Sequence, residues 1–239
     1  MERSKNHKEE NSLQNIAREF ECQGRHWFRQ AVPMSDVNAF KTICPDLDRP
    51  GKRLPLRKAR AAAGPALEQI LGKVQLLLPG AFPTRVTAFA KSSATNWQVP
   101  WHQDRVIEVA ERHEISDFHN WSRNGDGWHV EPPLNLLAGM LFVIVHLDAA
   151  DSGNGCLQLA PKSHLEGKIE MCQAPAIAAQ RTIETCAAKA GDLLCVKALT
   201  LHRSLSAKNS ARRRTMRIDF AADPLPAPLS WQTAALPIA

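Results

Sequence analysis

The chain contains no tyrosine, and this absence removes one class of chemistry. A mechanism that needs a tyrosine as an acid or as a radical is not open to it. The sequence also lacks a Cys-x-x-Cys pair, because its six cysteines are scattered at positions 22, 44, 156, 172, 186 and 195. Scattered cysteines without paired spacing indicate reduced thiols in a cytoplasmic protein and not a disulfide framework.

Long hydrophobic runs are also missing. No apolar stretch approaches the roughly 20 residues that a helix needs to cross a bilayer. The N-terminal residues are charged, and no apolar stretch follows them, which is not the pattern of a secretory signal. We therefore expect a cytoplasmic protein with no membrane partner.

The formal net charge is +6, which raises the question of a nucleic-acid partner. The positive charge is concentrated in residues 52–60 and at residues 212–214, with few aromatic side chains in between. Nucleic-acid sites usually combine basic side chains with aromatic or motif signals. No nucleic-acid partner is therefore expected, and an anionic small-molecule substrate fits the charge equally well.

The periodicity of the sequence changes along the chain. Residues 1–11 are too polar to pack and are predicted to be a disordered tail, whereas residues 12–239 contain no linker or repeat and are predicted to form a single domain. Helical periodicity extends to Pro79, with a break near Gly64-Pro65, and short β-type runs follow it. Helices followed by many short strands predict a mainly β barrel with flanking helices.

One long polar segment interrupts the strands. Residues 111–133 are rich in His, Trp, Asn and Gly and show no clear periodicity. Such segments in compact domains are often lids over a site. Trp121 and Trp128 fit a lid or simple aromatic packing equally well.

The strongest chemical signal is a candidate metal site. His102 and Asp104 are two residues apart, so on a strand they would point to the same side. His202 offers a second imidazole much later in the chain. Two histidines and one carboxylate on one face of an iron ion leave three positions open for substrates and dioxygen, which is typical of non-heme oxygenases.

An arginine near this site could bind an anionic cosubstrate. If residues 199–205 and 211–219 form a hairpin, His202 lies directly opposite Arg213, and Ser204 shares their face. A guanidinium there would suit the distal carboxylate of 2-oxoglutarate. Arg217 would face the same side, either pairing with Asp219 or another carboxylate, or receiving an anionic group of the substrate.

With these residues in place, the chain resembles the phytanoyl-CoA dioxygenase (PhyH-like) family of Fe(II)/2-oxoglutarate-dependent oxygenases. The resemblance runs from about Phe20 to Ala221. It rests on an ordered set of motifs: Trp101-His-Gln-Asp104, Asn154-Gly-Cys-Leu157, Pro161-Lys-Ser-His164, Gly191-Asp192 and His202-x-Ser204 followed by Arg213.

The resemblance implies a double-stranded β-helix, the jelly roll of cupin-like barrels. It implies that His102, Asp104 and His202 bind Fe(II), and that Arg213 with Ser204 holds 2-oxoglutarate. The implied reaction uses O2, releases succinate and CO2, and hydroxylates a small molecule. Asp104 stands where halogenating relatives have a small residue, so halogenation is not expected.

Several points stay open at the level of sequence. Arg212 and Arg214 flank Arg213, so a shift of one residue would select a different cosubstrate ligand. Lys91 and Gln98 could also reach the cosubstrate, and Lys162 stands where the family often has glycine. His146 is interpreted as a hydrogen-bonded core histidine.

Two other functions are compatible with the sequence. The chain could be a non-catalytic barrel that binds a metal or a metabolite, although the intact ligand set argues against this. It could also be a nucleic-acid repair oxygenase, which would need a pocket for a base removed from its stack.

Overall fold

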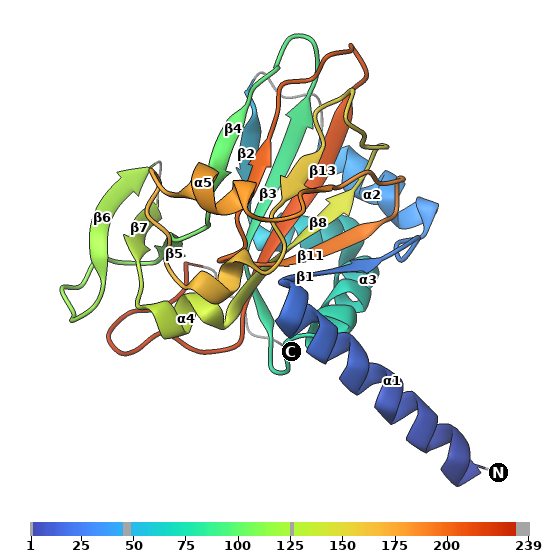
Figure 1. Cartoon of the computed structure of the whole chain (residues 1–239), viewed down its shortest axis with the longest axis horizontal. Helices are drawn as coiled ribbons and strands as arrows, with labels where there is room; N and C mark the ends of the chain where they lie inside the picture. Colours follow the sequence, from blue (N-terminus) through green and yellow to red (C-terminus); the bar gives the residue numbers. More distant parts are fainter. Residues whose placement is uncertain (1, 45–48, 125–126, 233–239) are drawn as a thin grey trace.

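In the computed structural model, the described residues are 2–44, 49–124 and 127–232. They form three antiparallel sheets flanked by helices (Figure 1). The six-stranded sheet has the order β1-β11-β8-β13-β3-β2, the four-stranded sheet β10-β9-β12-β4 and the three-stranded sheet β5-β7-β6. The sequence-based expectation of a mainly β protein with flanking helices is therefore confirmed.

In chain order, the strands are β1 Arg25–Phe28, β2 Gly51–Leu54, β3 Phe82–Lys91, β4 Val99–His102, β5 Ile107–Val109, β6 His119–Asn124, β7 Gly127–Glu131, β8 Met140–His146, β9 Leu157–Leu159, β10 Glu184–Thr185, β11 Leu193–Lys197, β12 His202–Ser204 and β13 Arg213–Ala221. The helices are α1 Glu2–Gln23, α2 Met34–Ile43, α3 Leu56–Gln75, α4 Leu134–Ala138, the 3-10 helix η1 Ser163–Glu166 and α5 Ala174–Ala179.

The main core lies between the six-stranded sheet and helices α2 and α3. Alternate residues of β13 point to opposite faces of the sheet, as in any strand. Met216, Ile218 and Phe220 pack into this helix-covered core. Arg213 and Arg217 consequently face the other side of the sheet, where the site is built.

Helix α3 is kinked. Ala63 has non-helical dihedral angles (φ −150°, ψ 44°) two residues before Pro65. Proline lacks an N–H and restricts the residue before it, so it interrupts a helix at such a point. This confirms the break predicted near Gly64-Pro65.

The N-terminal segment differs from its prediction. Helix α1 begins at Glu2, so the stretch 2–11, predicted to be disordered, is helical and extends away from the sheets (Figure 1). Glu and Lys are good helix formers, and a polar helix needs no buried face to satisfy its backbone hydrogen bonds. Among the described residues, no helix is both long and apolar enough to span a bilayer.

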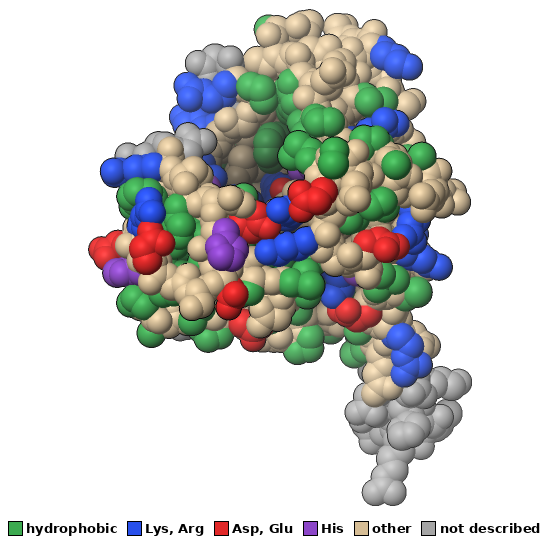
Figure 2. Space-filling model, turned by 60° about the vertical axis from the view of Figure 1, so that its left-hand side comes forward, with side chains coloured by type: hydrophobic (Ala, Val, Ile, Leu, Met, Phe, Trp, Pro, Cys, Tyr) green, Lys and Arg blue, Asp and Glu red, His purple; other side chains and the backbone are tan. Residues whose placement is uncertain are grey.

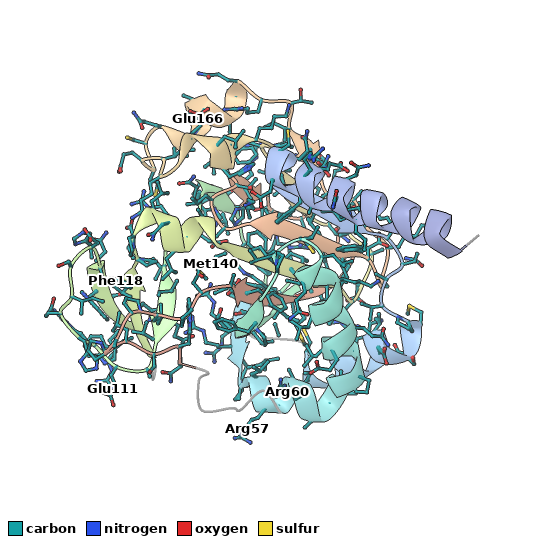
Figure 3. All side chains as sticks on the ribbon, turned by 90° about the horizontal axis from the view of Figure 1, so that it is seen from below. Arg57, Arg60, Glu111, Phe118, Met140 and Glu166 are labelled. Atoms are coloured by element: carbon teal, nitrogen blue, oxygen red, sulfur yellow. The ribbon has the colours of Figure 1, made fainter. Side chains whose placement is uncertain are left out.

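The polar segment 111–133 contains most of the three-stranded sheet. Strands β6 and β7 pair antiparallel, and β7 also pairs with β5. In Figure 3, Glu111 and Phe118 mark this lobe, and Met140 marks the start of β8 beside it. The strands are hard to recognise because most side chains of the segment are polar, and the few apolar ones of β6 and β7 that pack inward, Trp121, Trp128 and Val130, are too sparse to show an alternating pattern.

Glu131 at the end of β7 anchors the lobe to the rest of the protein. Its buried carboxylate accepts hydrogen bonds from Arg105 Nε and Nη2, both at 3.0 Å, and from Asn120 Nδ2 at 2.9 Å. Lys168 Nζ lies 3.1 Å away. Burial alone would raise the pKa of Glu131, but these hydrogen bonds outweigh it and lower the pKa to about 2.

Replacing Glu131 with Gln is expected to destabilise the fold by about 2 kcal/mol at neutral pH, because the charge-assisted hydrogen bonds are weakened. The folded pKa lies below the unfolded value, so this contribution is present above about pH 4.3 and is lost as the pH falls towards 2. Urea denaturation of both proteins across this range measures the difference. A difference that does not narrow on acidification would contradict the assignment.

Candidate metal centre and cosubstrate pocket

Three potential metal ligands converge at one end of the four-stranded sheet. One ligand atom from each of His102, Asp104 and His202 lies within 4.8 Å of the others, a spacing that could hold one metal ion. Strands β12 and β4 pair antiparallel with His202 directly opposite His102, and the ring centroids are 4.2 Å apart. Backbone pairing therefore brings the two imidazoles together.

This register corrects the hairpin expected from the sequence. β12 pairs with β4 and β9, while β13 pairs with β3 and β8, so the two strands belong to different sheets. His202 therefore faces His102 across the ladder, and Arg213 faces Lys91. Sequence reasoning chose the nearest strand as the partner, but the barrel pairs strands that are distant in the chain.

The position of Asp104 in the chain also differs from the expectation, because this residue lies after the strand and not in it. Strand β4 ends at His102, so the shared strand face expected for His102 and Asp104 does not position the carboxylate. The backbone N–H of Asp104 instead donates to Ala198 O at 3.0 Å, which fixes the chain just after the strand. This hydrogen bond places the Asp104 carboxylate beside the two imidazoles.

The two histidines are oriented in the same way. Nδ1 of His102 donates to Pro100 O at 2.8 Å, and Nδ1 of His202 donates to Thr200 O at 2.9 Å. A carbonyl oxygen can only accept, so Nδ1 carries the proton and Nε2 keeps its lone pair free. Burial lowers the pKa of His202 to about 4, so this ring is neutral at physiological pH. Both features suit metal ligands.

Arg217 holds the carboxylate of the triad in place. Its Nη2 lies 2.9 Å from Asp104 Oδ2 in an ion pair, and its Nε donates to Asp219 Oδ1 at 2.6 Å. Burial alone would raise the pKa of Asp104, but Arg217, His202 and His102 outweigh it and hold that pKa below its usual range. Pairing of Arg217 with carboxylates, one of the two roles considered from the sequence, is thus observed.

A cavity of about 110 Å³ adjoins the triad. It is lined by Phe89, Trp97, Val99, His102, Phe142, Ile144, His146, Leu157, His202, Ser204, Arg213, Thr215 and Arg217. Its walls are mostly apolar, with a few converging polar groups, which is the usual composition of a small-ligand pocket. His146 is buried, and its Nδ1 lies 3.2 Å from Asp192 O, which confirms the core role expected for it.

Arg213 is a buried cation in this cavity without a protein anion. Its Nε is buried and has no hydrogen-bond partner, and within residues 2–44, 49–124 and 127–232 no carboxylate pairs with it. Burial lowers the pKa of Arg213 to about 10, so it stays charged. The neighbours differ: Arg214 pairs with Asp148, and Arg212 is exposed. A buried unpaired cation is costly, so the cavity suits an anionic ligand.

Lys91 is a second buried cation beside the same cavity. Its Nζ donates to Ser204 Oγ at 3.0 Å and to Leu205 O at 2.5 Å, and lies 4.7 Å from the centre of the Trp97 ring. Burial first and then the charge of Arg213 lower the pKa of Lys91 to about 8. Neither Lys91 nor Gln98, the two side chains that the sequence left open for this role, lines the described cavity itself, but Lys91 contacts its wall through Ser204.

Gly155, in the Asn-Gly motif, makes room for this lysine. A Cβ at Gly155 would lie 2.4 Å from Leu205 O and 2.9 Å from Lys91 Nζ, and its φ of +71° is a left-handed conformation. Glycine satisfies both requirements without strain. Lys162 has a φ of 68°, so the position where the family often has glycine does adopt the glycine-type conformation.

The phytanoyl-CoA dioxygenase (PhyH) family matches the sequence over residues 32–215, which is more than half of the chain. The chain belongs to the phytanoyl-CoA dioxygenase family. Membership makes it a 2-oxoglutarate-dependent oxygenase-type enzyme, as the motifs predicted. A comparison with curated proteins finds no match.

Several solved structures share the fold of this protein. AviO1 from Streptomyces viridochromogenes Tue57 is 18% identical with a TM-score of 0.64, covering 90% of this chain and 98% of its own. The non-heme alpha ketoglutarate dependent carbocyclase SnoK from nogalamycin biosynthesis is 14% identical (TM-score 0.66, 92% and 86%). HygX from Streptomyces hygroscopicus, solved with nickel and 2-oxoglutarate bound, is 14% identical (TM-score 0.59, 87% and 86%). The jelly-roll fold is thereby confirmed.

Arg217→Lys keeps the positive charge beside Asp104 but loses the planar fork that contacts two carboxylates at once. We expect its affinity for a divalent metal to fall by about tenfold, the usual effect of removing a group that orients a metal ligand. Competition of Co(II) against a chromophoric chelator measures this.

Arg203→Lys is the matched control. Arg203 lies next to His202 in β12 but bonds Gln158 and stacks on Trp101, away from the triad. Equal loss of metal affinity in both variants would show that Arg217 acts only on general stability.

Proposed function

We propose that the protein is an Fe(II)/2-oxoglutarate-dependent dioxygenase that hydroxylates a small molecule and releases succinate and CO2. His102, Asp104 and His202 hold the iron, and Arg213 with Ser204 binds the distal carboxylate of 2-oxoglutarate. The single observation that supports this best is the buried guanidinium of Arg213, which has no carboxylate partner among the described residues and lines the same cavity as the histidines.

The residues present fit both groups. Two imidazoles whose Nδ1 atoms are bonded to backbone carbonyls and one ionised carboxylate are the donor set that a non-heme iron site needs. Iron with 2-oxoglutarate and dioxygen supplies the oxidising chemistry when bound. The protein itself orients the ligands, excludes water from a largely apolar cavity and neutralises the cosubstrate's charge.

Lys91 is proposed as a further cosubstrate group. Its Nζ donates to Ser204, which lines the same cavity as Arg213. Lys91 is buried without a carboxylate partner in the described part of the chain. A dicarboxylate placed between Lys91 and Arg213 would relieve the repulsion between these two cations.

A small-molecule substrate is supported by the relatives. HygX has been solved with hygromycin B bound, and the epimerase SnoN with alpha ketoglutarate and nogalamycin RO. The present chain keeps Asp104, so its iron site would lack the space that a halide ligand requires. Hydroxylation is therefore the outcome that we propose.

Arg213→Gln is expected to weaken 2-oxoglutarate binding about a hundredfold, because truncating one partner of a buried charge pair costs roughly 3 kcal/mol. The measurement is the visible charge-transfer band that forms when a keto acid chelates Fe(II) without oxygen. Arg212→Gln, which removes an exposed guanidinium one residue away, is the control and should bind normally.

His102→Ala should abolish both this band and succinate release with Fe(II), 2-oxoglutarate and ascorbate. Failure of the wild-type protein to form the band would remove the proposal. The alternatives give other results: a non-catalytic barrel forms the band without releasing succinate, and a nucleic-acid repair oxygenase binds DNA with a steep salt dependence.

The affinity for 2-oxoglutarate should also depend on pH through Lys91. With a pKa of about 8, Lys91 is charged below that pH and neutral above it, and only the charged form attracts a carboxylate. Affinity should fall by about tenfold as the pH rises across roughly 7 to 9. In Lys91→Met, anaerobic titrations over the same range should show a flat profile. A wild-type profile that is flat would exclude Lys91 from the pocket.

A further inference from the structure

A second and larger cleft opens beside the metal centre. It has a volume of about 660 Å³, which lies within the range of sites for small organic ligands, roughly 300–1,000 Å³. Phe89 and Arg217 line both this cleft and the cavity at the triad, so the two spaces adjoin. A molecule held in the cleft could therefore reach the metal centre.

The cleft lies between the edge of the six-stranded sheet and the three-stranded lobe. Strands β2, β3 and β13 supply one wall, and Glu108 of β5 with Gly127 of β7 supply the other. Figure 2 shows this face of the molecule hollowed, with Lys and Arg side chains along one rim. Gly51 lets the edge strand lie flat on Phe89, because a Cβ there would be 2.7 Å from its ring.

Positive charge dominates the lining. Among the described residues, five cationic side chains line the cleft, namely Arg49, Lys52, Arg53, Arg85 and Arg217, against one carboxylate, Glu108. Three of the arginines are held by carboxylates: Arg53 pairs with Glu108, Arg85 with Asp219, and Arg217 with Asp104 and Asp219. These pairs fix the guanidinium groups in the walls of the cleft.

Lys52 is the cation best placed to receive a ligand. It is exposed at the rim of the cleft, and no partner is found for it among the described residues. The described part of the lining offers little to an apolar molecule, since Phe89 is its one large apolar side chain, whereas the cavity at the triad is mostly apolar. Lysine and guanidinium groups gathered in this way bind oxyanions by charge-assisted hydrogen bonds.

We propose that this cleft, which we call the cationic cleft, binds the substrate through an oxyanion, the group shared by carboxylates and phosphate esters. The oxyanion lies at the rim near Lys52 and Arg53, and the rest of the molecule extends past Phe89 and Arg217 to the triad. This inference rests on the proposed function, because it names the substrate class of that site.

Matched probes test the charge. Phenyl phosphate, benzoate, benzamide and benzylamine share one aromatic ring and differ in the charge of their substituent. They are titrated calorimetrically into the full-length protein loaded with Mn(II) and 2-oxoglutarate. Both anions should bind at least tenfold more tightly than benzamide and benzylamine, and their binding should weaken with added salt. Whichever anion binds more tightly identifies the oxyanion, and binding of benzamide as tight as that of both anions would overturn the proposal.

Variants locate the binding site. Lys52→Glu should weaken binding of the tighter anion by about fivefold, as expected for a solvent-exposed charge. Lys58→Glu makes the same change on the exposed part of α3, outside the cleft, and should have no effect. Equal effects of the two variants would show attraction by net charge only and would overturn the assigned site.

The affinity for 2-oxoglutarate separates this inference from the proposed function. It should be the same in Lys52→Glu and the wild type, since Lys52 does not line the cavity at the triad. Displacement of 2-oxoglutarate by the probe would place the probe in the cosubstrate pocket and would refute the cationic cleft while leaving the oxygenase intact. If the wild-type protein does not bind 2-oxoglutarate, the proposed function is refuted instead.

Discussion

The antiparallel pairing of β12 with β4 is the constraint on which the site depends. It sets His202 opposite His102, and the turn that follows β4 brings Asp104 to the same point. A shift of one residue in this ladder would turn one imidazole to the other face of the sheet. The carbonyls of Pro100 and Thr200 accept from Nδ1 of these rings, so the same short strands provide both the position and the orientation of the two imidazoles.

Charge around the centre falls into two groups that have different functions. The positive charge of the largely buried Arg217 is compensated by Asp104 and Asp219, so this side chain has its partners without a bound ligand. Arg213 and Lys91 are buried without carboxylates in the described residues, which suits a ligand that arrives and leaves. Positive charge is thus left uncompensated where the cosubstrate is proposed to bind. Beside Asp104, the candidate metal ligand, the positive charge of Arg217 is compensated.

Much of this could be predicted from the sequence. Apolar periodicity located the helices, because that pattern reflects burial directly, and Gly64-Pro65 located the kink of α3. The set His102, Asp104 and His202 came from residue type and order. The partner of β12 could not be found, since ladder pairing between distant strands leaves no local trace. The helix at 2–11 was missed because the stretch is polar throughout, and the strands of the lobe were missed because their few apolar residues are too sparse to form a pattern.

The distance in sequence between β4 and β12 has a consequence for how the triad could bind a metal ion. During synthesis the first imidazole and the carboxylate leave the ribosome long before the second imidazole does. A nascent chain therefore offers an incomplete donor set, too weak to retain a divalent ion. Closing so long a loop comes late in folding, because its entropy is recovered only when the sheets are already packed. A metal ion held by all three side chains would therefore bind only after these distant strands have paired.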